Sequence, residues 1–139
     1  MGFIIKNECS NVKWSCVVEI LKAVGMSYFD EEMHKKSFEN SYSTVFIYDD
    51  NELIGFGRAI SDGVRQAAIY DVAVLPNYQG NGVGTIIINN ILESISQCNV
   101  ILYASPGKED FYKKLNFKKM KTGMAHFQNI ERFQKKGII

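Results

Sequence analysis

The chain has 139 residues, of which 46% are hydrophobic and 22% carry a formal charge. These values fit one folded domain over residues 1–139 and exclude a disordered segment. The 16 Lys and Arg residues nearly balance the 15 Asp and Glu residues, so the net charge of +1 predicts neither a nucleic-acid partner nor an anionic membrane surface. No apolar run approaches the roughly 18 residues that a membrane helix needs, and the N-terminus lacks the pattern of a signal peptide.

Three cysteines, Cys9, Cys16 and Cys98, are too far apart to predict a disulfide framework or a zinc site. Their number is odd, and no C-x-x-C pair occurs among them. We therefore expect no metal in this protein and a location in the reducing cytoplasm.

The first half of the chain predicts an early strand, two helices and a run of three strands. Trp14, Val17, Leu21 and Val24 follow helical spacing, and Gly25 is a stop signal. Turn residues separate the β-rich runs that follow, which predicts an antiparallel meander. The expected elements are a strand over 3–5, helices over 14–24 and 30–40, and strands over 44–48, 53–60 and 67–74.

The second half begins with a helix that has one strongly apolar side. Val83, Ile87, Ile91 and Ile95 recur every four residues, so this helix should lie against a sheet. The expected elements are a helix over 83–97, a strand over 100–104, a helix over 110–115, and strands beginning at 117 and over 124–127. Clustered strands followed by a β-α-β unit predict an α/β (α+β) fold with a mixed sheet.

The segment from Val72 to Thr85 carries the strongest chemical signal. A strand ends, glycines follow at positions 80, 82 and 84, and a helix begins within the turn. Glycines let a ligand approach the backbone closely, and the N–H groups at a helix start attract phosphate or pyrophosphate. The spacing matches neither the dinucleotide fingerprint nor the ATP P-loop, and the glycines could also serve only a tight turn.

Two motifs, in this order, resemble the signatures of the GNAT superfamily of N-acetyltransferases. Gln79-x-x-Gly82-x-Gly84 is similar to that family's acyl-CoA pyrophosphate motif, and residues 72–76 resemble its fourth strand. Residues 111–117 resemble its second signature, with Asn116 where the family usually has Gly. Asn tolerates a left-handed backbone better than other non-glycine residues, so this turn should be kept. The resemblance implies a mostly antiparallel central sheet flanked by helices.

By the same resemblance, acetyl-CoA is the co-substrate, and it is bound mostly through main-chain groups. Its pantetheine arm would pair with the backbones of Val72 and Val74, much as a peptide adds to the edge of a sheet. The residues expected to hold the pyrophosphate are Gln79, Gly80, Gly82, Val83, Gly84 and Thr85.

The resemblance also implies groups for proton transfer. Tyr112 matches the position that often protonates the departing sulfur, and a phenol with a pKa of about 10 is protonated at neutral pH. Asp71 is a candidate base on the strand beside the cleft, where alternation places it on the face of Ile69 and Ala73. Asp71 could instead be a structural carboxylate, with water removing the proton. An N–H at a strand bulge, such as that of Val72, could polarise the thioester carbonyl.

The acceptor is expected to be an amine of a small molecule or a peptide, and folds of this type can form a homodimer. The acidic residues 30–32 could attract a cationic amine, or they could form a solvated helix start capped by Asp30. Two other functions stay open. One is an acyl-CoA-binding module without turnover, in which Tyr112 only packs. The other is a nucleotide-binding fold unrelated to acyl transfer.

Overall fold

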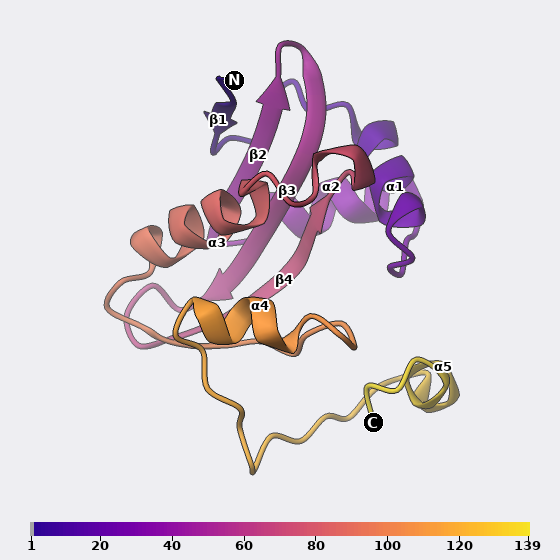
Figure 1. Cartoon of the computed structure of the whole chain (residues 1–139), viewed down its shortest axis with the longest axis vertical. Helices are drawn as coiled ribbons and strands as arrows, with labels where there is room; N and C mark the ends of the chain where they lie inside the picture. The colour runs from indigo at the N-terminus through magenta and orange to yellow at the C-terminus, as the bar shows by residue number, and fades with distance from the viewer. Residues whose placement is uncertain (1) are drawn as a thin grey trace. The chain divides into compact units, whose positions relative to one another are not determined.

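The computed structural model describes residues 2–139, which divide into two compact units; Met1, the first residue of the expected domain, lies outside the described residues. The first unit ends at Ile101, and the second runs from Leu102 to Ile139. The elements of the first unit are β1 (Ile4–Lys6), α1 (Trp14–Ala23), α2 (Glu31–Glu39), β2 (Ser43–Asp49), β3 (Glu52–Ser61), β4 (Gln66–Val74), the 3-10 turn η1 (Pro76–Tyr78), α3 (Val83–Ser94) and β5 (Asn99–Ile101) (Figure 1). The second unit contains α4 (Glu109–Lys114) and α5 (Ile130–Lys135).

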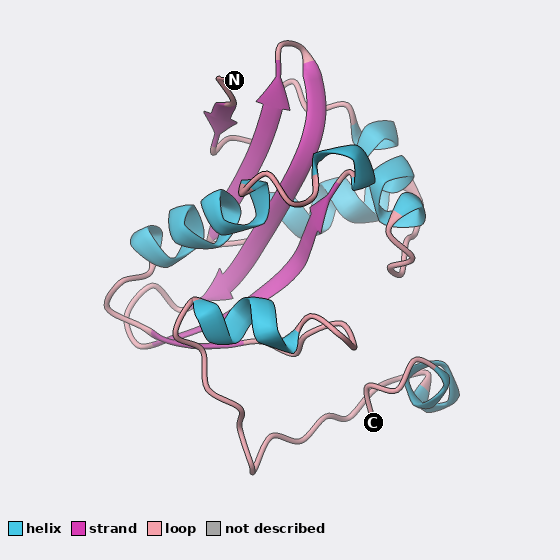
Figure 2. Ribbon diagram, in the orientation of Figure 1, coloured by secondary structure: helices cyan, strands magenta, loops and turns pink. Residues whose placement is uncertain are grey.

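A five-stranded sheet forms the centre of the first unit, in the order β1-β2-β3-β4-β5 (Figure 2). Neighbouring strands are antiparallel from β1 to β4, and β5 pairs parallel with β4. Short turns join β2 to β3 and β3 to β4, whereas α3 makes the crossover that the parallel pair requires. This topology confirms the mixed, mostly antiparallel sheet flanked by helices.

Helices cover both faces of this sheet. On one face, Phe46 and Phe56 pack with Trp14 of α1 and Phe38 of α2 in a buried core. On the other face, α3 lies so close that a Cβ built at Gly57 would stand 2.8 Å from Ile87 Cγ2. Because Gly57 has no side chain, α3 can pack directly on the sheet.

Two of the predicted helix boundaries are set by identifiable groups. Gly25, with φ +74°, follows α1 and ends it, as glycine commonly does after a helix. Asp30 accepts a hydrogen bond from the Met33 N–H at 2.9 Å and so caps α2. The helix-cap alternative for Asp30 is confirmed.

The second unit differs from the sequence-based expectation. The predictions of strands beginning at 117 and over 124–127 are wrong, because these residues form loops, and α5 follows in a tail for which we expected no element. Met124 is 98% exposed, so this end of the expected strand buries no apolar side chain. Phe127 instead stacks on Phe133 of α5, with ring centroids 3.8 Å apart. Local ring packing has replaced the expected strand pairing.

Candidate functional site

The glycine-rich loop between β4 and α3 is shaped by two left-handed residues. Gly80 and Gly82 have φ angles of +84° and +81°, a conformation that strains any other side chain. A Cβ built at either glycine would meet no described atom within 4 Å, so there is space beside the backbone. A ligand can therefore approach the main-chain N–H groups of this loop closely.

Helix α3 begins without a cap from any described side chain. Gly82 is its N-cap residue, and the first turn, which contains Val83, Gly84 and Thr85, has no acidic residue. The Ile86 N–H makes a hydrogen bond to the Gly82 carbonyl at 3.1 Å. The N–H groups that precede Ile86 lie at the positive end of the helix dipole, which makes this helix start suited to an anion.

Two side chains fasten the loop to the ends of the strands. Gln79 Nε2 donates a hydrogen bond to the Val74 carbonyl at 2.9 Å, and the Tyr78 hydroxyl donates one to Asp49 Oδ2 at 2.6 Å. The bond to the Asp49 carboxylate raises the pKa of Tyr78 to about 12, because ionisation of the phenol would break it. Gln79 thus lies beside the glycines, and its side chain holds the loop in place.

The edge of β4 that faces away from β3 is paired with β5 over only part of its length. The β5 ladder runs from Gln66 to Ala68 of β4 and ends there. Leu75 N–H donates to the Ile54 carbonyl at 2.8 Å, so the alternation of an antiparallel ladder turns the N–H groups of Val72 and Val74 away from β3. The two N–H groups that we expect to pair with pantetheine therefore point toward the edge of β4 that β5 leaves unpaired.

A bulge interrupts β4 just before these residues. Phe56 lies opposite Ala73 and Arg58 opposite Tyr70, so two residues of β4, Asp71 and Val72, lie opposite the single residue between them in β3. Asp71 has φ +57°. The bulge breaks the alternation of side chains, so the prediction that Asp71 shares the face of Ile69 is wrong. Asp71 instead lies with Tyr70 on the face covered by α2, where both contact Arg58.

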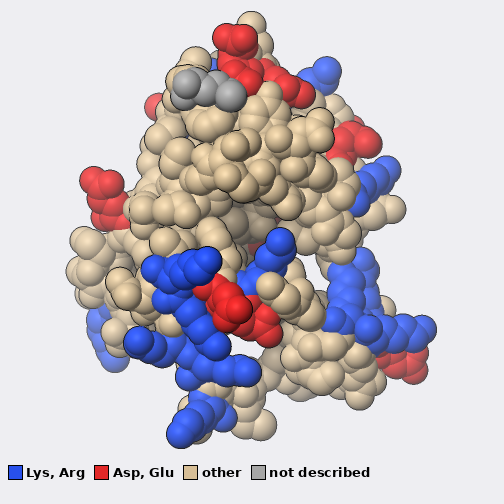
Figure 3. All heavy atoms as spheres, viewed as in Figure 1, with Lys and Arg blue, Asp and Glu red and all other residues tan. Residues whose placement is uncertain are grey.

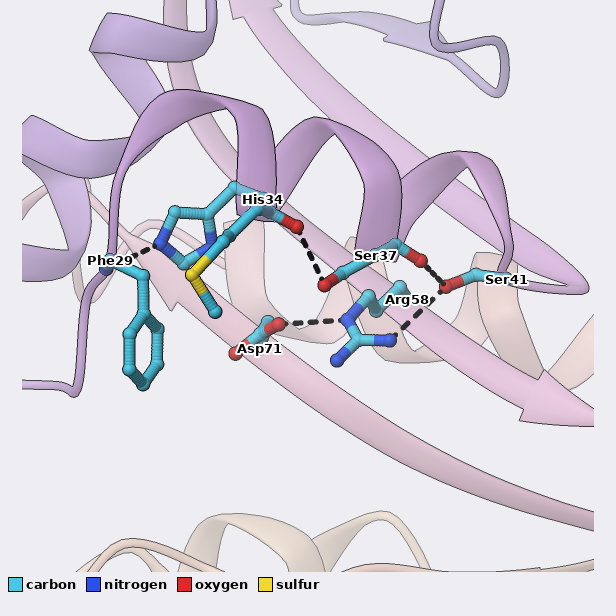
Figure 4. A network of polar contacts seen from close by, with 7 residues as sticks. Phe29, His34, Ser37, Ser41, Arg58 and Asp71 are labelled. Carbon is cyan, nitrogen blue, oxygen red and sulfur yellow. Dashed lines mark hydrogen bonds and ion pairs between the residues drawn. The ribbon is translucent and has the colours of Figure 1, made fainter.

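Arg58 of β3 holds the Asp71 carboxylate on the α2 side of the sheet (Figure 4). Its Nε donates to Asp71 Oδ2 at 2.8 Å, and the two side chains are 15% and 23% exposed. Its Nη1 donates to Ser41 Oγ at 3.3 Å, and the guanidinium lies over the rings of Phe38 and Tyr70. The carboxylate is thus paired with a cation, as the structural alternative for this residue requires.

His34 is a buried neutral histidine in the same region of α2 (Figure 4). Its Nε2 accepts a hydrogen bond from the Phe29 N–H at 2.9 Å, which a protonated imidazole could not do. Burial lowers the pKa of His34, which agrees with the neutral form. This histidine therefore fastens the segment before α2 to the helix.

In the second unit, residues 111–117 close helix α4. Phe117 N–H donates to the Tyr112 carbonyl and Asn116 N–H to the Lys113 carbonyl, both at 3.1 Å, which is a Schellman motif. Asn116 has φ +69°, so the left-handed backbone expected there is confirmed. The rings of Tyr112 and Phe117 lie in contact, with centroids 5.6 Å apart. Burial raises the pKa of Tyr112, which keeps the phenol protonated at neutral pH.

Arg58 is the residue of this region that the sequence motifs did not indicate. It lies outside both motifs, and only the register of β3 against β4 places it beside the bulge. A weak signal was present, because an arginine within the apolar and glycine-rich run 53–60 must find a partner if that strand is buried.

Charge is divided unequally between the two units. Residues 102–139 contain nine of the 16 Lys and Arg residues but three of the 15 Asp and Glu residues. Lys and Arg side chains stand in groups on the face seen in Figure 3. The near balance of the whole composition therefore conceals a basic second unit, whose field attracts anions.

Two further observations concern residues 2–139 taken together. None of their helices combines the length and the apolar character that crossing a membrane requires. No three of their His, Cys, Asp and Glu side chains gather closely enough to hold a metal ion.

Comparison with known proteins gives one consistent family. Residues 8–134 match a family model described as an acetyltransferase (GNAT) domain. An uncharacterized N-acetyltransferase, ycf52-like, of Prochlorococcus marinus is 36% identical over 102 residues, which cover 68% of this chain and 57% of that protein. Serotonin N-acetyltransferase 2, chloroplastic, of Oryza sativa subsp. japonica is 27% identical over 144 residues, which cover 96% of this chain and 72% of that protein.

Solved structures show the same fold. A protein of unknown function from meticillin-resistant Staphylococcus aureus has a TM-score of 0.82 at 27% identity, with 92% of this chain and 100% of that chain covered. The first curated relatives are longer than this chain, which spans about half of their length.

Proposed function

Because the chain belongs to the GNAT family of acetyltransferases, we propose that it transfers an acetyl group from acetyl-CoA to an amine. The observation that supports this most directly is the start of α3, which no described side chain caps and which follows two left-handed glycines. Open space beside a left-handed glycine also occurs at Gly25 and Gly107, so the alternative in which these glycines serve only a tight turn is tested by CoA binding.

The glycine-rich loop suits the pyrophosphate of acetyl-CoA. The N–H groups of Gly82 to Thr85 would bind its oxygens through charge-assisted hydrogen bonds, which are shorter and stronger than neutral ones. Gln79 would act indirectly, because its side chain fixes the loop to the Val74 carbonyl. The basic second unit would add long-range attraction for an anionic co-substrate.

The partly paired edge of β4 suits the pantetheine arm and the thioester. The Val74 N–H would pair with an amide of the arm, as a strand is added to a sheet edge. The Val72 N–H would donate to the thioester carbonyl and stabilise the negative charge that develops on its oxygen. Acetyl-CoA would supply the acetyl group as a thioester, and the chain would supply these main-chain donors.

The amine nitrogen must lose two protons, one before and one after it attacks, and the departing sulfur gains one. An alkyl amine has a pKa of about 10.4 and must lose a proton before it attacks, whereas the thiolate, with a thiol pKa of about 8.5, leaves more easily if it is protonated. The neutral amine forms the new C–N bond in a ternary complex, and the C–S bond breaks. The nitrogen then loses its second proton to water, and we assign the proton for the sulfur to Tyr112, which water reprotonates. Holding both reactants in attack geometry lowers the activation free energy by several kcal/mol.

For Asp71, the ion pair with Arg58 favours the structural role over the role of general base. The Asp71 carboxylate oxygen Oδ2 already accepts a hydrogen bond from Arg58 Nε at 2.8 Å, so this oxygen is occupied within the protein. We therefore assign removal of both amine protons to water and keep Asp71 as the residue that forms the bulge.

The acceptor that we propose is a small-molecule or peptide amine. One relative is named for the acetylation of serotonin, a small amine, which supports the first of these classes. The homodimer, the cytoplasmic location and the absence of a nucleic-acid partner stay predictions, as does a single domain over residues 1–139. Relatives named as chloroplastic show that members of the family also work in another compartment.

One assay tests the proposal against its alternatives. The purified chain is incubated with acetyl-CoA and a panel of small and peptide amines, and release of free CoA thiol is followed. Thiol release that depends on one class of amine supports the enzyme. Tight CoA binding without release for any amine would support the binding module, and binding of ATP or NAD without any response to CoA would favour the unrelated nucleotide fold.

A further inference from the structure

The bulge of β4 contains a residue whose backbone needs support. The described non-glycine residues with positive φ are Asn11, Asp50, Asp71 and Asn116. Among them, Asp71 lies within a strand, at φ +57°. Glycine is the usual residue in a left-handed bulge position, because any Cβ crowds the backbone there. The conformation of Asp71 must therefore be held by contacts outside its own backbone.

Arg58 supplies these contacts from the neighbouring strand. It binds the Asp71 carboxylate through Nε at 2.8 Å, and its guanidinium is itself fixed by Ser41 Oγ and by the rings of Phe38 and Tyr70. Ser41 Oγ in turn donates to a carbonyl of α2 at 2.8 Å. A planar guanidinium can make all of these contacts at once, whereas a lysine ammonium cannot stack in this way.

The bulge decides which way the Val72 N–H points. In a regular strand, Val72 would lie opposite Phe56, but the extra residue puts Ala73 in that place. Ala73 and Phe56 belong to the hydrogen-bonded set of the ladder, because the Leu75 N–H donates to Ile54 two residues further along each strand. Without the extra residue, the Val72 N–H would be used within the sheet. With it, that N–H turns to the opposite edge of β4.

We propose that Arg58 is a positioning residue for acetyl transfer: its ion pair with Asp71 holds the bulge that presents the Val72 N–H to the thioester carbonyl. The inference rests on the proposed function, since the thioester is the substrate of that function. Arg58 touches neither reactant in this proposal and acts only through Asp71 and the backbone of β4.

The test compares Arg58→Met with Arg65→Met, which removes an exposed arginine from the turn before β4. Loss of the N–H that donates to the thioester carbonyl should lower kcat by about 10- to 100-fold in Arg58→Met, and the affinity for CoA should fall as well, because the same change of register turns the Val74 N–H into the sheet. Arg65→Met should leave both values unchanged. Arg58→Lys, which keeps the charge and a folded core, should lie between the wild type and Arg58→Met, and it replaces the methionine variant if that protein does not fold.

Rescue separates positioning from a general loss of stability. Glycine adopts positive φ without help, so adding Asp71→Gly to Arg58→Met should restore at least about tenfold of the lost kcat. A double variant as slow as Arg58→Met, or an Arg58→Met enzyme with wild-type kcat, would overturn the inference. An inactive Asp71→Gly enzyme would also overturn it, because the carboxylate would then act for itself.

A measurement without turnover keeps this inference distinct from the proposed function. Hydrogen exchange by NMR should show a fast-exchanging Val72 amide in the wild type and a protected one in Arg58→Met, where that amide joins the β3 ladder. If the wild type releases no thiol with any amine, the proposed function fails while this result still decides the role of Arg58. Equal exchange in the two proteins would refute that role.

Discussion

Gly82→Ala should weaken CoA binding more than it weakens the fold. Gly82 has φ +81°, and a non-glycine residue in this region costs roughly 1–2 kcal/mol. A Cβ at this position meets no described atom within 4 Å, so we expect no clash with the protein itself. The free energy of unfolding should therefore fall by about the strain alone.

The effect on binding has a different cause. The new methyl group would occupy the space through which a diphosphate approaches the start of α3. Losing one hydrogen bond to a charged group costs about 1.5–3 kcal/mol, which corresponds to a roughly 10- to 100-fold rise in Kd. Isothermal titration with CoA measures the Kd, and denaturant unfolding measures the stability.

Gly25→Ala is the matched control for this substitution. Gly25 has φ +74°, its Cβ would also meet no described atom within 4 Å, and it lies at the end of α1 rather than in the glycine-rich loop. We expect a similar loss of stability and an unchanged Kd for CoA. Equal Kd values for wild type, Gly82→Ala and Gly25→Ala would refute the loop as the pyrophosphate site.

Substitutions at three other residues test the remaining assignments. Tyr112→Phe should lower kcat with little change in CoA affinity. Because burial raises the pKa of this phenol, the wild-type rate should fall only above pH about 10, where the proton donor ionises, and the variant should lack this limb of the pH–rate profile. Asn116→Ala should lower stability by about 1 kcal/mol and Asn116→Gly should not, since φ is +69°. Gly57→Ala should destabilise by about 1–3 kcal/mol, because its Cβ would stand 2.8 Å from Ile87 Cγ2.

Each of these variants has a result that would count against its assignment. Wild-type kcat in Tyr112→Phe would remove the phenol from proton transfer. Equal unfolding curves for the two Asn116 variants would mean that the left-handed turn has no measurable cost. Gly123→Ala, whose Cβ would lie 3.7 Å from Met120 Cβ, should change stability by less than about 0.5 kcal/mol, and a loss as large as that of Gly57→Ala would undercut the packing argument.

The sheet and its flanking helices could be predicted because their signals are local. The apolar rows of α1 and α3 have helical periods, and turn residues mark the limits of β2, β3 and β4. The glycine-rich loop could also be predicted, because the left-handed positions before α3 are occupied by glycines, which are visible in the sequence.

The family resemblance implied a strand bulge at Val72, but local signals predicted neither its extra residue nor its support. The alternation of side chains along a strand holds only when each residue lies opposite one residue of the neighbouring strand. The sequence around Asp71 carries no local signal of an extra residue in β4. Arg58 becomes relevant only when the two strands are paired, because the contact joins residues on different strands. The predictions of strands beginning at 117 and over 124–127 were wrong for a related reason, because a strand needs a neighbouring strand to pair with. Phe127 stacks on Phe133 of α5 instead.

The most direct test of the pyrophosphate site is an NMR titration of the 15N-labelled chain with CoA. We predict that the amide signals of Gly80, Gly82, Val83 and Gly84 shift together and saturate at one Kd, and that acetyl-CoA, unlike CoA, also shifts the Val72 amide. Saturable shifts elsewhere in the chain, with these loop amides unmoved, would contradict the assignment of the glycine-rich loop as the site that binds the co-substrate.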